Sequence, residues 1–210
     1  MQTRRNWIRS SIGLGGLLLA PNLALSKEEI RKFNPRPLSK TIKLSSNENP
    51  YGPSEKVQKA VIKAFENGCR YPRAFSSALA KKLAKLHGVN SENIIITGGS
   101  TEGLKITGLT FANGGGEIIA AKPTFLAMIN FAKQWGAKIR WVPVGKDKGY
   151  DLNAINNRIN TNTKLVFLCN PNNPTGTVVG KESLIDFCSS ASKKTIIFSD
   201  EAYYDFIQTP

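Results

Sequence analysis

Histidine is nearly absent from this chain, since His87 is the only one among 210 residues. A Ser-His-Asp triad or a multi-histidine metal centre in this segment would need that single residue, so both classes are set aside. His87 also precedes Gly88 at the predicted end of a helix, where a histidine commonly serves the helix terminus. We therefore predict no metal site and assign His87 to helix termination.

Cysteine is scarce as well, and its pattern excludes the common cysteine-based sites. Cys69, Cys169 and Cys188 are odd in number, widely spaced and without a CxxC pair. This pattern predicts neither a disulfide framework nor a zinc site. Cys169 ends an apolar run, which predicts a small buried thiol there.

Acidic residues are outnumbered: 15 Asp and Glu stand against 29 Lys and Arg, for a formal net charge of +14. Such a balance raises the possibility of nucleic-acid binding. The positive side chains, however, are spread along predicted helix faces, as at Lys56, Lys59 and Lys63, without an arginine-rich tract or an aromatic platform. We predict a solvated basic surface and no nucleic-acid partner.

The N-terminal segment lacks the run of about 20 apolar residues that a bilayer span needs. Residues 1–26 are instead typical of a signal peptide. Residues 3–9 (TRRNWIR) resemble the twin-arginine consensus, residues 12–20 form a short glycine- and leucine-rich run, and residues 24–26 offer small side chains for cleavage. We expect a periplasmic or exported protein without a stable membrane span after cleavage; an uncleaved N-terminal anchor is the alternative.

Apolar periodicity then predicts an alternation of helices and strands. Helical spacing covers residues 54–67, 77–87, 101–112, 124–135, 151–159 and 181–193. Short apolar runs predict strands over residues 94–96, 118–120, 139–142, 165–168 and 196–198, with the third as an edge strand. This order predicts an α/β fold, a three-layer α/β/α arrangement around a mainly parallel sheet. Residues 27–53 are predicted to form an N-terminal arm and substrate-entrance segment, and residues 54–210 a ligand-binding domain.

Polar and glycine-rich motifs follow four of these strands. Residues 98–101 follow the first strand, 123–125 the second, 170–176 the fourth and 200–203 the fifth. Ligands of open parallel sheets bind beyond the carboxyl ends of the strands. The four motifs therefore predict a single site at that edge of the sheet.

The residue types in these motifs suit a phosphorylated aromatic ligand. Glycines before a helix start, with Ser100 or Thr101, favour a phosphate, although both are also ordinary N-caps. Asp200 suits a pyridinium nitrogen or a simple cap. Phe125 suits ring stacking or core packing, and Asn173 and Tyr203 are possible donors to a ring oxygen.

Residues 170–176 (NPNNPTG), followed by residues 199–203 (SDEAY), resemble the fold-type I aminotransferases of class I/II. Residues 44–53 (LSSNENPYGP) and 70–72 (RYP) are similar to the corresponding segments of histidinol-phosphate aminotransferases. The resemblance covers residues 43–210, with the motifs in family order. It implies the large domain of a pyridoxal-phosphate-dependent transferase.

The resemblance also implies pyridoxal 5′-phosphate as the cofactor, with definite roles for the motif residues. Gly99, Ser100 and Thr101 would hold its phosphate, Phe125 would stack on its ring, and Asp200 would pair with its pyridine nitrogen. Asn173 and Tyr203 would bind its phenolic oxygen. Tyr71 would reach the phosphate in a neighbouring subunit of a homodimer with shared active sites. The substrate entrance would be lined by Asn47, Asn49 and Tyr51.

The implied reaction is amino-group transfer between an amino acid or amino-alcohol phosphate, of which histidinol phosphate is an example, and a 2-oxo acid. In the family the Schiff-base lysine lies beyond the position of Pro210, so we expect it and the small C-terminal domain to be missing from this chain, which alone should be inactive. Lys193 and Lys194 do not match the motif. A lyase or decarboxylase of the same fold, or a non-catalytic pyridoxal-phosphate-binding protein, are the alternatives.

Overall fold

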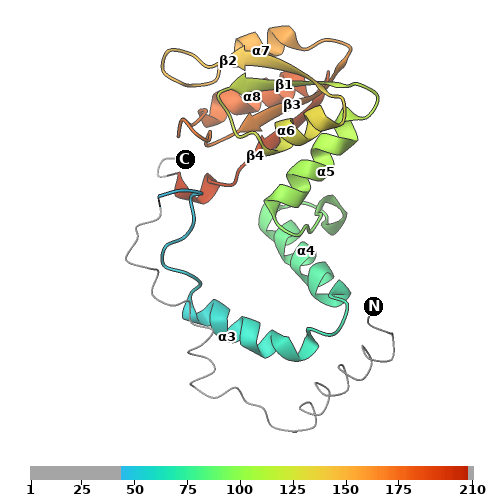
Figure 1. Cartoon of the computed structure of the whole chain (residues 1–210), viewed down its shortest axis with the longest axis vertical. Coiled ribbons are helices and arrows are strands. Elements are labelled where there is room, and N and C mark those ends of the chain that lie inside the picture. The colour runs from blue at the N-terminus through green and yellow to red at the C-terminus, as the bar shows by residue number, and fades with distance from the viewer. Residues whose placement is uncertain (1–43, 208–210) are drawn as a thin grey trace, which may run out of the picture. The chain divides into compact units, whose positions relative to one another are not determined.

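A computed structural model describes residues 44–207 (Figure 1). The chain divides into two compact units, Met1–Tyr71 and Pro72–Pro210. The predicted signal peptide, residues 1–26, and residues 27–43 of the predicted arm lie outside the described residues. Within residues 44–207, no helix has the length and apolarity needed to traverse a bilayer.

The described part of the first unit, residues 44–71, contains the α-helix α3 (Glu55–Ala64), which continues into the short 3₁₀ helix η1 (Phe65–Asn67). Ser54 has an extended backbone, and its hydroxyl accepts a hydrogen bond from the Val57 amide at 3.4 Å. This is the standard way of satisfying a free N–H at a helix start. The predicted N-cap is therefore confirmed, and Gly68 follows η1 as the predicted stop.

The second unit carries the sheet. Its elements are, in chain order, α4 (Arg73–His87), η2 (Ser91–Asn93), α5 (Ser100–Ala112), β1 (Glu117–Lys122), α6 (Ala127–Gln134), β2 (Lys138–Pro143), α7 (Leu152–Arg158), β3 (Thr163–Cys169), α8 (Lys181–Ala191), β4 (Ile196–Asp200) and η3 (Tyr204–Phe206). Helix α4 ends where Gly88 adopts a left-handed φ of 66°, which a glycine reaches without steric cost. His87 therefore closes this helix, as predicted.

The four strands pair only in parallel, in the order β2-β1-β3-β4 (Figure 1). Strand β2 lies at an edge, as predicted for residues 139–142. The chain runs from β1 outward to β2 and then returns past β1 to β3, so its direction of winding reverses between β1 and β3. A crevice at the carboxyl ends of the strands is expected at such a reversal.

Helices cover both faces of this sheet, and strand alternation decides which side chains meet which helices. Ile118 and Ala120 of β1 belong to the core cluster that contains residues of α5 and α6. Ile119, between them, belongs to the cluster that contains residues of α7 and α8. Because successive strand residues point to opposite faces, a strand buried on both sides is a continuous apolar run. The predicted three-layer α/β/α fold is confirmed.

The strand predicted at residues 94–96 is wrong. Ile94 has an extended backbone, with φ −112° and ψ 124°, but this segment belongs to no strand of the described chain. Ile95 is 85% exposed. β-branched residues favour extended backbone, whereas a strand also needs a hydrogen-bonded neighbour. The segment leading to Gly98 is therefore an extended connection.

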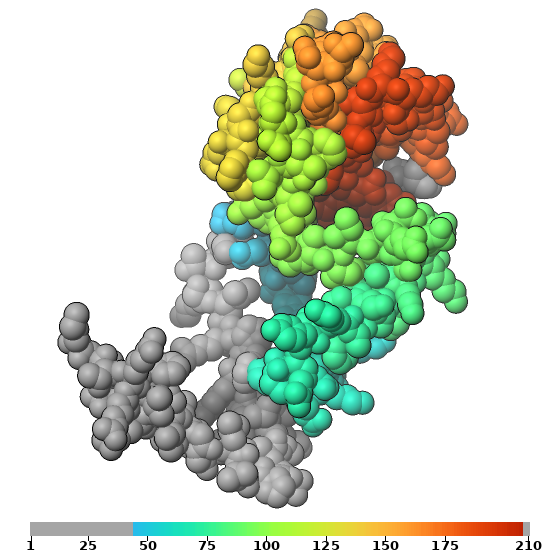
Figure 2. Space-filling view, turned by 90° about the vertical axis from the view of Figure 1, so that its right-hand side faces the viewer, coloured from blue at the N-terminus to red at the C-terminus, as the bar shows by residue number. Residues whose placement is uncertain are grey.

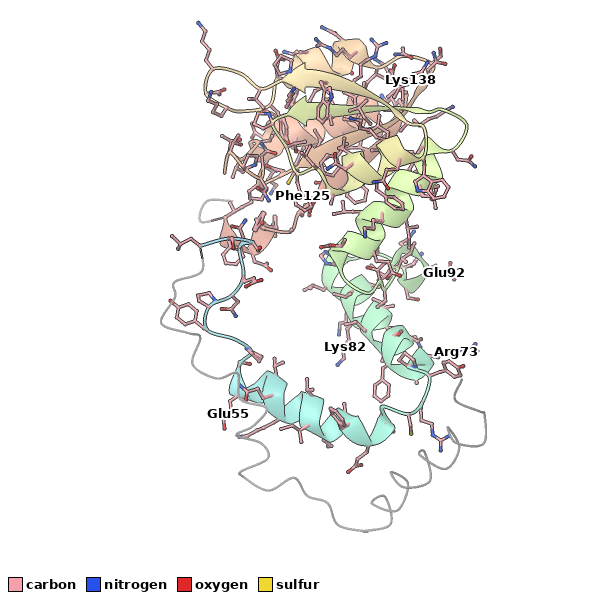
Figure 3. All side chains as sticks on the ribbon, viewed as in Figure 1. Glu55, Arg73, Lys82, Glu92, Phe125 and Lys138 are labelled. Carbon is pink, nitrogen blue, oxygen red and sulfur yellow. The ribbon has the colours of Figure 1, made fainter. Side chains whose placement is uncertain are left out.

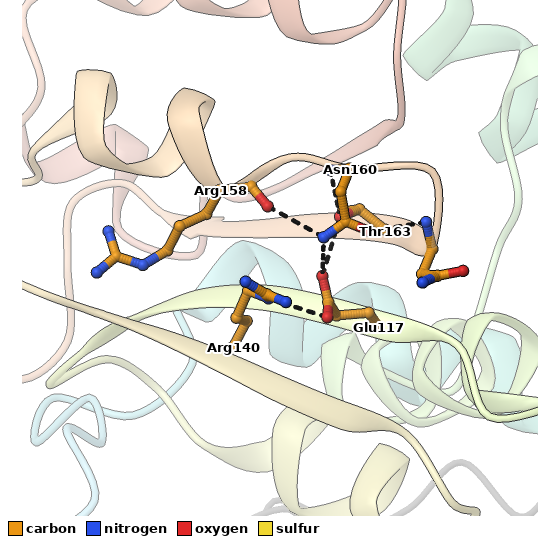
Figure 4. A network of polar contacts seen from close by, with 6 residues as sticks. Glu117, Arg140, Arg158, Asn160 and Thr163 are labelled. Carbon is orange, nitrogen blue, oxygen red and sulfur yellow. Dashed lines mark hydrogen bonds and ion pairs between the residues drawn. The ribbon is translucent and has the colours of Figure 1, made fainter.

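At the amino ends of the strands, the carboxylate of Glu117 is surrounded by donors (Figure 4). Arg140 Nε lies 2.9 Å from Glu117 Oε2, and Asn160 Nδ2 and Thr163 Oγ1 donate to Oε1 at 2.7 and 3.2 Å. Burial by itself would raise the pKa of Glu117, but these bonds outweigh it and lower that pKa. The network ties β1, β2 and β3 together at this end.

Candidate functional site

At the opposite end of the sheet, β4 and α5 line a cavity of about 260 Å³, here called the Asp200 cavity. The space-filling view shows the red C-terminal residues beside the green segment that begins α5 (Figure 2). The lining residues are Ser100, Gly103, Leu104, Phe198, Ser199, Asp200, Glu201 and Ala202. The motifs predicted from residues 98–101 and 200–203 therefore meet at one cavity.

Asp200, the last residue of β4, is only 8% exposed. Its Oδ1 accepts a hydrogen bond from the Ala202 amide at 3.3 Å, and no Lys or Arg of residues 44–207 forms an ion pair with it. Burial raises the pKa of Asp200, and the nearby charge of Glu201 raises it further. A buried carboxylate without a cation is costly, so this position favours a positively charged ligand group.

The start of α5, in contrast, favours a negatively charged ligand group. Gly99 is the N-cap, at φ 94° and ψ 165°, and Ser100 and Thr101 begin the first turn. The first amides of a helix lack intrahelical acceptors and attract anions. The alternative role of Ser100 or Thr101 as N-cap is wrong. The carboxylate of Glu102 accepts a hydrogen bond from the Gly98 amide, so an anionic group already lies at this end.

Phe125 follows β1 and Asn173 follows β3, and the backbones of both lie near the Cys169 thiol. Figure 3 labels Phe125 after β1 and Lys138 at the start of β2, at opposite ends of the sheet. Both Phe125 and Asn173 are half-buried. Burial raises the pKa of the Cys169 thiol, although the backbones of Asn173 and Phe125 stabilise its thiolate. The thiol, buried as predicted, therefore lies beside the backbone of both predicted cofactor contacts.

The sequence interpretation missed the polar side chains that support these contacts. Thr124 donates to Asn172 Oδ1 at 3.0 Å, and the Tyr150 hydroxyl lies 2.9 Å from the same oxygen. Thr124 and Asn172 stand within the predicted motifs, but their inward orientation depends on the pairing of β1 with β3. Nothing in the sequence distinguishes Tyr150. Ala202, in the last motif, was also overlooked as a lining residue.

The remaining predicted residues are placed only in part. Tyr203 is half-buried and precedes η3. Tyr71, predicted to reach the neighbouring subunit, belongs to the first compact unit and is exposed. The same holds for the three residues predicted at the substrate entrance, Asn47, Asn49 and Tyr51. Their roles stay predictions.

The Asp200 cavity therefore combines two chemical preferences. The amides at the start of α5 favour an anion such as a phosphate. Asp200, which has no ion pair within the described part of the chain, favours a protonated nitrogen. A ligand with a phosphate at one end and a basic ring nitrogen at the other meets both requirements.

Known proteins match this chain in sequence and in fold. It is 38% identical over 169 residues to histidinol-phosphate aminotransferase 1 of Bacillus cereus, a match that covers 80% of this chain and 45% of that protein. Among solved structures, histidinol-phosphate aminotransferase from Sinorhizobium meliloti in complex with pyridoxal-5'-phosphate has a TM-score of 0.70 and 24% identity, covering 76% of this chain and 44% of that one. L-threonine-O-3-phosphate decarboxylase from Porphyromonas gingivalis shares the fold, with a TM-score of 0.61 and 21% identity, over 75% of this chain and 47% of that one.

This chain spans about half the length of the curated relatives that it matches. The family Aminotransferase class I and II matches residues 39–210. That range contains the start of α5, the loops at residues 123–125 and 170–176, and Asp200, in the order that the sequence resemblance predicted. The chain belongs to the aminotransferase class I and II family.

Proposed function

We propose that this domain holds pyridoxal 5′-phosphate in the Asp200 cavity. We further propose that the whole protein transfers an amino group between an amino acid or amino-alcohol phosphate, similar to histidinol phosphate, and a 2-oxo acid. The observation that carries the proposal is the buried carboxylate of Asp200, which forms no ion pair with any Lys or Arg of residues 44–207 and shares its cavity with the start of α5. Curated relatives 36–39% identical to this chain are histidinol-phosphate aminotransferases, which supports the substrate class.

When bound, the cofactor supplies an electron sink whose strength depends on a proton at its ring nitrogen. Asp200 would hold that proton in place. Burial raises the pKa of Asp200. Because the carboxylate is shielded from water, its ionised form also gains more from a nearby positive charge than an exposed carboxylate would. The same residue therefore binds the ring and sets its charge.

At the other end, Gly99, Ser100 and Thr101 would receive the phosphate through the free amides of the first turn of α5. The Glu102 carboxylate, now bonded to the Gly98 amide, would have to share or yield that donor. The fit therefore rests mainly on the backbone, with the two hydroxyls as added donors.

The ring face and the phenolic oxygen would be bound from the segments that follow β1, β3 and β4. Phe125 would cover one face, and Asn173 and Tyr203 would donate to the oxygen and stabilise its anion. In the proposed homodimer, Tyr71 would reach the partner's phosphate. Entry of the substrate would then involve the exposed segment around Asn47, which is a proposal from the sequence resemblance.

A titration of the purified whole protein with pyridoxal 5′-phosphate tests this function. We expect a bound-cofactor absorbance band that changes on adding an amino donor and returns on adding a 2-oxo acid. Release of carbon dioxide instead would identify a decarboxylase. Absence of any bound band would refute the cofactor proposal itself.

We also propose that residues 1–26 direct export by the twin-arginine route, on the pattern of residues 3–9. That route carries folded proteins, so the cofactor would be inserted before export. Replacing both Arg4 and Arg5 by lysine should leave the protein in the cytoplasmic fraction. Unchanged export of that variant would contradict the proposal.

A further inference from the structure

The hydroxyl of Tyr150, in the segment before α7, is the centre of a polar cluster at the ends of β1 and β3. It lies 2.9 Å from Asn172 Oδ1, 3.2 Å from Thr124 Oγ1, and 3.0 Å from both the amide nitrogen and the carbonyl oxygen of Cys169. A phenol has one proton to donate and lone pairs to accept. The Cys169 amide donates to it, and it can donate in turn to Asn172.

Asn172 extends this cluster into both loops. Its Oδ1 also accepts a hydrogen bond from Thr124, while its Nδ2 donates to the Pro123 carbonyl at 3.2 Å and to Thr175 Oγ1 at 2.8 Å. Asn172 is 2% exposed and Thr124 is 5% exposed. Because water scarcely reaches these side chains, their polar atoms depend on protein partners.

The cluster members directly precede the predicted cofactor contacts in the chain. Thr124 precedes Phe125, and Asn172 precedes Asn173. These two loops follow β1 and β3, the strands between which the winding reverses, and Tyr150 reaches them from a third segment. The Tyr150 hydroxyl therefore connects the two loops whose separation decides how far apart Phe125 and Asn173 lie.

We propose that Tyr150 is a positioning residue for the cofactor: through Asn172 and Thr124, its hydroxyl fixes the spacing between Asn173, at the phenolic oxygen, and Phe125, at the ring face. The inference rests on the proposed function. Burial raises the pKa of Tyr150, so the hydroxyl keeps its proton and remains a donor at neutral pH.

The variant Tyr150→Phe tests this inference, because it keeps the ring and removes the hydroxyl. The Cys169 amide then loses its acceptor and Asn172 loses one donor. We expect the affinity for pyridoxal 5′-phosphate to fall about tenfold. We also expect the pH midpoint of the bound cofactor's absorbance change to rise by about half to one unit, because a displaced Asn173 stabilises the phenolate less.

Thr195→Val is the matched control. The buried Thr195 hydroxyl donates to the Thr163 carbonyl at 3.1 Å, at the amino end of the sheet. This variant also loses one buried hydroxyl, so its melting temperature should fall comparably. Its cofactor affinity and pH midpoint should match those of the wild type, because Thr195 lies far along the strands from the proposed ring.

The double variant Tyr150→Phe with Asn173→Ala separates positioning from general loss of stability. If Tyr150 acts through Asn173, the pH midpoint of the double variant equals that of Asn173→Ala alone. Additive shifts, or a midpoint in Tyr150→Phe equal to that in Thr195→Val, would overturn the inference. A wild type without a bound-cofactor band would instead refute the proposed function, so the two failures are distinguishable.

Discussion

The two ends of the parallel sheet shift the pKa of a buried carboxylate in opposite directions. At the amino end, Glu117 receives donors from Arg140, Asn160 and Thr163, and its pKa is lowered. At the carboxyl end, Asp200 is equally buried, receives one backbone amide, and its pKa is raised. Both residues are 8% exposed; desolvation raises both pKa values, but only at Glu117 do the hydrogen-bonding partners outweigh it.

The number of hydrogen-bonding and ionic partners contributes to this difference in pKa. A carboxylate whose oxygens are all paired stabilises the fold, whereas one left without a cation is kept at a cost in stability. Such a cost is common where a protein prepares a binding site before the ligand arrives. We therefore interpret the amino end of the sheet as structural and the carboxyl end as functional, and each variant below tests that division.

The largest expected effect is on cofactor affinity in Asp200→Asn. Removing one member of a buried, hydrogen-bonded charge pair weakens binding by about 2–5 kcal/mol, which is at least about thirtyfold in the dissociation constant. Titration with pyridoxal 5′-phosphate, followed by absorbance, measures it. An unchanged dissociation constant would show that Asp200 does not face the ring nitrogen.

The next effect is on stability in Glu117→Gln. The glutamine amide would face Arg140 with a donor where an acceptor stood, and we expect the free energy of unfolding to fall by about 1–3 kcal/mol. Denaturant unfolding measures this loss. Cofactor affinity, measured on the same sample below its melting temperature, should stay at the wild-type value, because Glu117 lies at the other end of β1. A parallel loss of affinity would break the division between the two ends.

An effect of similar size is expected in Gly99→Ala, at the start of α5. A Cβ there meets no atom within 4 Å, so the penalty comes only from the backbone, whose φ of 94° and ψ of 165° suit glycine alone. We expect a loss of about 1–3 kcal/mol in stability and weaker phosphate binding, because relief of the strain turns the amides away. Inorganic phosphate and pyridoxal 5′-phosphate titrations measure the binding.

Gly180→Ala is the control for that variant. Gly180 also precedes a helix and has open space around its Cβ position, but its φ is −61°. An alanine fits this backbone, so stability should change by less than about 1 kcal/mol. Equal losses in the two variants would show that the conformation of Gly99 is not what matters.

Much of this division follows from local sequence pattern. The apolar runs predicted β1, β3 and β4, and a polar residue directly after such a run placed Asp200 at the carboxyl edge. Residues 94–96 show the limit: isoleucines predict extended backbone, but pairing depends on a neighbour that local sequence does not reveal.

The partners of each carboxylate were not predictable in the same way. Glu117 and Arg140 are brought close by the parallel register of β1 with β2, in which Glu117 pairs with Lys138 and Ile119 with Arg140. Asn160 reaches Glu117 only from the turn before β3. Likewise, the absence of a cation beside Asp200 is a property of the assembled edge. Residue type predicted the candidate contacts, and strand register decided their charge environment.

The last expected effect is the pH dependence of the stability of the cofactor-free protein, which has opposite signs at the two ends. Asp200 has a raised folded-state pKa, so its ionisation opposes folding, and Asp200→Asn should stabilise the protein at neutral pH. That gain should be absent below the ordinary value of 3.8 and grow as the pH rises through the folded-state pKa. Glu117 has a lowered pKa, so its contribution is present above 4.5 and is lost as the pH falls through the folded-state value.

Free energies of unfolding for the wild type, Asp200→Asn and Glu117→Gln, measured from acid to neutral pH, check both signs. The Asp200→Asn gain should also disappear when pyridoxal 5′-phosphate saturates the wild type, because the ring nitrogen then supplies the missing charge. A loss of stability in cofactor-free Asp200→Asn at neutral pH would mean that Asp200 is a structural residue like Glu117. The two ends of the sheet would then differ in position only, and the carboxylate would no longer distinguish the binding site from the scaffold.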